Sequence, residues 1–175
     1  MDLLTIPYEA VRDFLELGGD VLTLIALTIF GMWALIVERL IYFKTALKAQ
    51  GISIREKWEA RAERKSWHAH QIREGMVSEF SIQANYFVPV IQTLVALCPL
   101  LGLMGTVTGM IEVFDVMAIS GTGNARSMAS GVSKATIPTM AGMVGALSGV
   151  FLVTFITRSI EREVETLEDN LTMDH

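Results

Sequence analysis

Apolar residues in this chain fall into three long blocks that are separated by charged segments. The blocks cover residues 21–43, 87–111 and 135–157, and the second and third contain no Asp, Glu, Lys or Arg. A helix rises about 1.5 Å per residue, so roughly 20 apolar residues cross the hydrocarbon core of a bilayer. The pattern predicts an all-α integral membrane protein with three transmembrane helices.

The segment before the first block, residues 1–20, alternates apolar and acidic positions at helical spacing. Tyr8, Val11 and Phe14 share one helical face, and Gly18-Gly19 is expected to end the helix. This pattern predicts an amphipathic helix on the outer membrane surface, with a disordered terminus as the alternative.

Residues 44–86 combine dense mixed charge with an apolar stripe at helical spacing, which predicts a helical cytoplasmic insertion. The stripe is expected to pack on the same chain or on a neighbouring subunit. Ser53 to Glu56 fits a capping box, which predicts a helix start there. No stop signal stands between residues 85 and 87, so the second span is expected to continue inward as one long helix.

The last two blocks are joined by residues 112–134, an outer connection with turn-forming Gly and Ser residues near position 120. Its later part, from Arg126 to Lys134, is expected to be helical and to lead into the third span. Residues 158–175 form a cytoplasmic tail. The whole chain is thus expected to form a single membrane domain.

Charge distribution sets the expected orientation. The net charge is −5, yet eight of the 14 Lys and Arg residues lie in 44–86 and only one lies in 1–20. Basic residues near spans stay in the cytoplasm, whereas acidic residues contribute little to orientation. The N-terminus is therefore expected outside and the C-terminus inside.

Glycines recur at helical spacing in the second and third blocks, and each trio shares one face. The trios are Gly102, Gly105 and Gly109, and Gly142, Gly145 and Gly149. Small residues let membrane helices approach closely. We expect these faces to pack between subunits of a homo-oligomer; packing within one chain is the alternative.

Polar groups in the last two blocks suggest an ion pathway. Four threonines of these blocks, Thr106, Thr108, Thr136 and Thr139, are expected to line a polar lumen with Lys134, which lies at the outer edge of the third span. An ionisable group at this depth must reach the interface, pair or face water. Glu112 and Asp115, the charges of the outer mouth, are its candidate partners.

Other chemistry is not expected. His68 and His70 lack further ligands nearby and, at i and i+2, point to different sides of a helix, so no metal site is predicted. The sequence shows no nucleophile–base pair, so the chain is not expected to be an enzyme. No cofactor or nucleic acid is expected to bind; membrane lipid surrounds the spans.

Two motifs resemble the ExbB/TolQ/MotA family of energy-coupling subunits, and ExbB most of all. The second block contains CPLLGLMGTV (98–107), similar to the family pattern AP-x-x-GLxGTV. SGVSKA (130–135), followed by TMAG (139–142), is similar to the family's third span, but Lys134 replaces the family glutamate. Both motifs stand on the expected spans at the expected separation.

This resemblance implies a proton-channel subunit in the bacterial inner membrane, a homopentamer whose second and third spans line a central lumen. It implies ExbD-like single-span subunits in that lumen, and a TonB-like protein that drives outer-membrane import of iron chelates and similar cargo. Thr106 and Thr139 match the family's lumen threonines. The short chain and Lys134 are also similar to ExbB variants of second TonB systems, which use an additional TtpC-like subunit. Alternatives are a TolQ-type envelope subunit, a MotA-type stator subunit or a non-conducting membrane scaffold.

Overall fold

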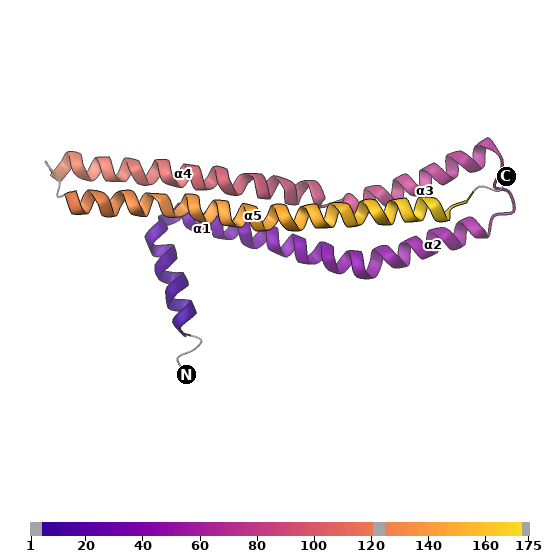
Figure 1. Ribbon diagram of the computed structural model, residues 1–175, viewed down its shortest axis with the longest axis horizontal. Helices are drawn as coiled ribbons and strands as arrows, with labels where there is room; N and C mark the ends of the chain where they lie inside the picture. Colours follow the sequence, from indigo (N-terminus) through magenta and orange to yellow (C-terminus); the bar gives the residue numbers. More distant parts are fainter. Residues whose placement is uncertain (1–4, 121–124, 173–175) are drawn as a thin grey trace. The chain divides into compact units, whose positions relative to one another are not determined.

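The computed structural model describes residues 5–120 and 125–172, and its regular elements there are helices (Figure 1). They are α1 (Thr5–Tyr42), the π-helix η1 (Phe43–Leu47), α2 (Lys48–Glu59), α3 (Trp67–Asn85), α4 (Val88–Ser120) and α5 (Ala125–Asn170).

Within residues 5–120 and 125–172, three stretches are long and apolar enough to cross a membrane, in agreement with the three predicted spans. They lie within Gly19–Glu59, Trp67–Ile119 and Met128–Asn170. Each is longer than the roughly 20 residues that a bilayer core requires, so each helical stretch also extends beyond it. The Gly/Ser-rich turn predicted near position 120 lies largely outside the described residues.

The helix before the first span ends where the glycine pair predicted. α1 is two helices joined at Gly19, whose backbone has φ 64° and ψ −162°. A positive φ costs little at glycine because it has no Cβ. The location of the first of these helices on the membrane surface stays a prediction.

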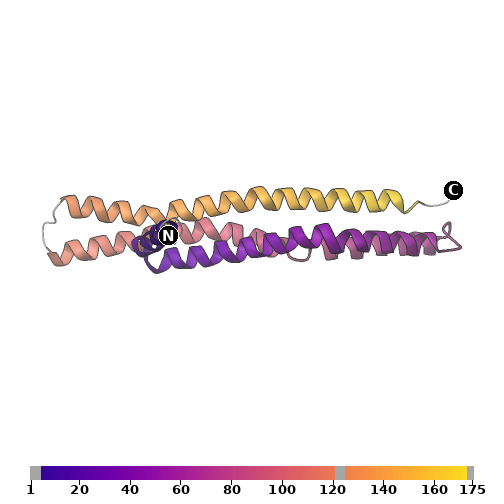
Figure 2. The same cartoon turned by 90° about the horizontal axis from the view of Figure 1, so that it is seen from below.

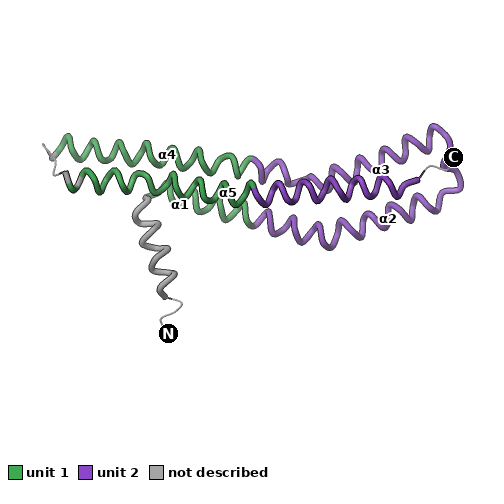
Figure 3. The backbone as a smooth tube through the Cα atoms, in the orientation of Figure 1, with its two compact units in different colours: residues 1–33, 93–150 green, residues 34–92, 151–175 purple. Residues whose placement is uncertain are grey.

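The chain divides into two compact units (Figure 3). The first unit comprises Met1–Trp33 and Thr93–Val150, and the second comprises Ala34–Gln92 and Phe151–His175. In the first unit α4 and α5 lie side by side in both views (Figure 1, Figure 2). A buried face of α1 that includes Leu22, Ile25 and Met32 completes its core.

The second unit has a core of large side chains. Trp58, Phe80 and Leu171 are each at most 2% exposed. The indole Nε1 of Trp58 donates to the backbone carbonyl of Thr172 at 3.0 Å, so part of the predicted apolar stripe packs on the same chain. Large apolar side chains removed from water stabilise a fold by roughly 1.5–3 kcal/mol each.

Arg73 holds the end of α5 within this unit. Its guanidinium donates to the backbone carbonyls of Leu171 and Glu168, both at 2.7 Å, and reaches the Glu168 carboxylate at 3.4 Å. The last carbonyls of a helix have no partner within the helix, and its C-terminus carries partial negative charge. Arg73 therefore satisfies one of these carbonyls, that of Glu168, and also the carbonyl of Leu171 directly after the helix, with a matching charge.

The predicted helix start at Ser53 is wrong, because Ser53 lies inside α2. The chain enters α2 directly from η1, so no unpaired N–H group awaits a cap at that point. A capped helix start is found instead at α3. Its N-cap is Ser66, whose hydroxyl accepts from the N–H of Ala69 at 3.2 Å.

Glu63 supports this cap. Its carboxylate accepts from the backbone N–H and the hydroxyl of Ser66, at 2.6 and 2.8 Å. The side-chain hydrogen bond from Ser66 is the main reason that the pKa of Glu63 is lowered from its ordinary value, since donors favour the charged carboxylate.

The second span continues inward, as predicted, within the helical stretch Trp67–Ile119, but two turn residues interrupt the helix. α3 ends at Asn85, and α4 begins at Val88. Pro89 has no N–H to donate to the carbonyl of Asn85, four residues earlier, so the series of helical backbone hydrogen bonds is interrupted there.

Arg39 is almost fully buried, with 6% of its surface exposed. Its guanidinium lies over the rings of Tyr42 and Phe87, with its Cζ at 4.7 and 4.8 Å from their centroids.

Candidate functional site

The close approach of α4 to α5 depends on glycine. A Cβ on Gly102 would lie 2.9 Å from the carbonyl oxygen of Pro138 and 3.0 Å from the Cα of Thr139. A Cβ on Gly142 would meet the backbone carbonyl of Cys98. Backbone thus packs on backbone, the arrangement that small residues allow in membranes.

The other four glycines also face side chains of the same chain. Gly109 lies against Ala135, so that a Cβ on Gly109 would be 2.9 Å from the Ala135 methyl group, and Gly105 lies against Pro138. Gly145 and Gly149 face α1, against Ile29 and Met32 respectively. The alternative that both trios pack within one chain accounts for these contacts. Packing between subunits stays a prediction.

Two of the four threonines predicted to line a lumen, Thr106 and Thr139, meet at the contact between α4 and α5. The hydroxyl of Thr139 donates to the carbonyl of Gly102 at 3.0 Å and is in contact with the hydroxyl of Thr106. Both side chains are half-buried. A hydroxyl has one proton to donate and two lone pairs, so this pair can still accept from a water or an acidic group.

The hydroxyls of Thr108 and Thr136 bond within their own helices. Thr106 does so too, to the carbonyl of Gly102 at 3.4 Å, but it is also in contact with a hydroxyl of the other helix. Thr108 donates to the carbonyls of Met104 and Gly105, both at 3.1 Å, and Thr136 donates to Ser133 at 2.7 Å. Such bonds satisfy a threonine without any partner helix.

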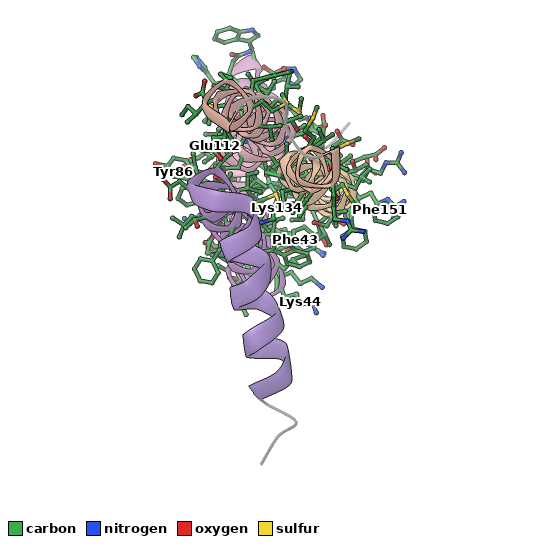
Figure 4. All side chains as sticks on the ribbon, turned by 90° about the vertical axis from the view of Figure 1, so that its left-hand side faces the viewer. Phe43, Lys44, Tyr86, Glu112, Lys134 and Phe151 are labelled. Carbon is green, nitrogen blue, oxygen red and sulfur yellow. The ribbon has the colours of Figure 1, made fainter. Side chains whose placement is uncertain are left out.

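Lys134 lines a cavity of about 630 Å³ in the first unit. Three helices form its walls, and each contributes one ionisable side chain: Asp20 from α1, Glu112 from α4 and Lys134 from α5. Figure 4 labels Glu112 and Lys134 among the side chains. We call this space the charged cavity.

Two candidate partners of Lys134 were predicted, and they differ in their location relative to the charged cavity. Glu112 shares the charged cavity with Lys134, whereas Asp115 is outside its lining. All three are exposed, and within the described residues Lys134 forms no ion pair with either carboxylate. The threonine pair is likewise absent from the cavity lining, so the predicted residues form two separate groups.

Sequence reasoning missed Asp20 as a member of this site. The available signal was an acidic residue directly after Gly19 at the start of an apolar block. Its proximity to residues more than 90 positions later depends on helix packing, which periodicity alone does not give.

Three long apolar helices, two of them joined through glycines and a threonine pair, define a multi-span helical membrane protein with polar groups within its packed spans. Residues 38–169 match the MotA/TolQ/ExbB proton channel family. The chain belongs to this family. The matched region contains Thr106, Thr139 and Lys134, and Asp20 lies before it.

Two similar proteins come from Synechocystis sp. strain PCC 6803, and their names describe ExbB-like biopolymer transport proteins. ExbB-like 1 is 48% identical over 60 residues, and ExbB-like 3 is 36% identical over 64 residues. The aligned parts cover 33% and 35% of this chain, but only 24% and 30% of those relatives. The match therefore spans less than a third of either relative.

Proposed function

We propose that this chain is a proton-channel subunit of an energy-transducing complex in the bacterial inner membrane. The observation that carries the proposal is the family match over residues 38–169, which includes both polar helices. The threonine pair supports it, because half-buried hydroxyls at a helix contact supply hydrogen-bonding groups inside apolar spans.

The proposed orientation places the N-terminus outside and the C-terminus inside. Eight of the 14 Lys and Arg residues lie in 44–86, which supports a cytoplasmic location for that segment. With this orientation the spans are 21–43, 87–111 and 135–157. Residues 1–20 and 112–134 are then outside, and 158–175 form a cytoplasmic tail.

The proposed assembly is a homopentamer whose second and third spans surround a lumen that holds ExbD-like single-span subunits. Large apolar side chains on α4 and α5 support the need for covering partners or lipid: Leu100, Val107 and Leu147 are 61%, 53% and 69% exposed. The complex would act through a TonB-like protein on outer-membrane import of iron chelates and similar cargo, with a TtpC-like accessory subunit.

Lys134 requires its own account, because an ammonium has donors only and cannot accept a proton. We propose that Lys134 offers a positive charge to a carboxylate of the single-span partner or to Glu112, and that the acid of the partner is a relay. The absence of an ion pair from Lys134 to Glu112 or Asp115 among the described residues leaves this charge available.

The experiment that tests the proposal is native mass spectrometry of the detergent-extracted complex, followed by proton-flux measurement in proteoliposomes. We expect several copies of this chain with a smaller single-span subunit, and flux that requires both. A complex that assembles but conducts no protons would contradict the channel proposal and favour the alternative of a non-conducting scaffold.

The role of Lys134 is tested in the same assay. Lys134→Ala and Lys134→Glu are each expected to reduce flux; full activity of both would exclude the proposed role of Lys134.

A further inference from the structure

The charged cavity brings together ionisable groups that are far apart in the sequence. Among the described residues that line it, Asp20 and Glu112 are the two carboxylates and Lys134 is the one cation. Within the described residues, none of the three is engaged in an ion pair or a hydrogen bond. Their charges are therefore not neutralised by direct contact, although they share one space.

The lining of the charged cavity also contains uncharged polar groups that can bind water. Thr108 and Ser130 add hydroxyl groups to the lining. Water occupies about 30 Å³ per molecule in the liquid, so about 630 Å³ holds on the order of ten or more waters. Hydroxyls, carboxylates and water together can form a continuous hydrogen-bonded path along which protons move.

The roles of the three charged groups differ by their chemistry. A carboxylate can take up and release a proton, whereas the Lys134 ammonium has three donors and no acceptor. Lys134 shares the cavity with both carboxylates, so its charge and its N–H donors can orient them and the water between them.

We propose that Asp20 and Glu112 are the proton-exchanging groups of the charged cavity and that Lys134 acts through them as a positioning charge. A proton entering with water binds one carboxylate and leaves from it again to water, with no other bond made or broken. This inference rests on the proposed function, since it assigns residues to the same proton pathway. Asp20 precedes the region matched by the family, so the assignment depends on the cavity itself.

The test is proton flux through the reconstituted complex as a function of pH, with three variant complexes. Asp20→Asn with Glu112→Gln removes both exchangeable groups while keeping size. Glu112→Asp keeps an acid at the same position. Asp115→Asn is the matched control, because Asp115 is an exposed carboxylate one turn from Glu112 that does not line the cavity. Native mass spectrometry verifies the subunit composition of each complex.

We expect the double variant to lose at least about tenfold in flux, since a positioned proton-transfer group contributes typically 10²–10⁴-fold. Glu112→Asp should retain most of the flux with a shifted pH profile, and Asp115→Asn should match the unmodified complex.

Equal flux and an unchanged pH profile in an assembled double variant would overturn the inference. So would equal losses in the double variant and Asp115→Asn, which would indicate surface charge in general. If the double variant does not assemble, the pH profile of Glu112→Asp decides: an unchanged profile overturns the inference. Absence of flux from the unmodified complex would instead reject the proposed function.

Discussion

The two compact units are held together by different kinds of contact. In the first unit, α4 and α5 meet through glycines, so that Gly142 brings its backbone to the carbonyl of Cys98. In the second unit, the core consists of bulky side chains such as Trp58 and Phe80, and Arg73 bonds the end of α5.

This difference matches the environment expected around each unit, which is lipid for the first unit and water for the second. The first unit contains most of the uncharged helix, where lipid removes the hydrophobic drive between helices and close backbone packing takes its place. The second unit contains most of the charged segment, where burial of apolar surface from water provides the drive. The same chain thus uses small residues and large residues for the same purpose in two environments.

The largest expected effect is in the second unit. Trp58→Ala should lower the free energy of unfolding by about 3–5 kcal/mol, as for other fully buried tryptophans, because it leaves a cavity and removes the hydrogen bond to Thr172. Chemical unfolding in detergent measures this. Trp67→Ala is the matched control, since Trp67 is 70% exposed. Equal losses in both variants would contradict the comparison.

Adding a methyl group should destabilise the first unit, whereas the second unit is destabilised by removing a large side chain. Gly142→Ala places its Cβ against the backbone carbonyl of Cys98, which cannot rotate away, and we expect a loss of about 1–3 kcal/mol. Gly31→Ala has open space around the new methyl group and should stay within about 0.5 kcal/mol of the unmodified protein. Thermal unfolding of both proteins in one detergent provides the measurement.

A smaller effect is expected at the end of α5. Arg73→Ala removes the bonds to the carbonyls of Leu171 and Glu168, and we expect a cost of about 1–2 kcal/mol with faster amide exchange over residues 168–172. Arg55→Ala breaks only an exposed pair with Glu59, for which about 0.3–0.5 kcal/mol is typical. Unchanged exchange in Arg73→Ala would show that the tail is held without this side chain.

The smallest effect concerns the start of α3. Because the pKa of Glu63 is lowered in the folded protein, its contribution to stability is present above the ordinary value of 4.5. That contribution is lost as the pH falls through the lowered folded value. The protection factor of the Ser66 amide, which is corrected for the intrinsic slowing of exchange in acid, should therefore fall on acidification in the unmodified protein and change less in Glu63→Gln. Identical pH dependence in the two proteins would exclude this cap.

Periodicity and block length predicted the spans well, because a helix in lipid must satisfy its own backbone and display apolar side chains throughout. The stop at Gly19 was also predictable, since glycine accepts a positive φ without strain. These features depend only on nearby residues.

Features that depend on context were missed. The capping pattern at Ser53 has the right residues, but the chain is already helical there, whereas Ser66 begins a helix without that full pattern. The contact of Trp58 with Thr172 spans 114 positions, and the sharing of one cavity by Asp20 and Lys134 requires three packed helices. Local patterns give no register between distant helices.

The proposed pathway through the α4–α5 contact is tested most directly by proton flux in proteoliposomes containing the complex with Thr106→Val and Thr139→Val. Valine keeps the shape of threonine and removes the hydroxyl, and Thr28→Val is the control, because the Thr28 hydroxyl bonds the carbonyl of Leu24 in its own helix. We expect loss of flux in the double variant, with assembly retained, and unchanged flux in Thr28→Val. An assembled double variant that conducts protons as fast as the unmodified complex would contradict the proposed pathway.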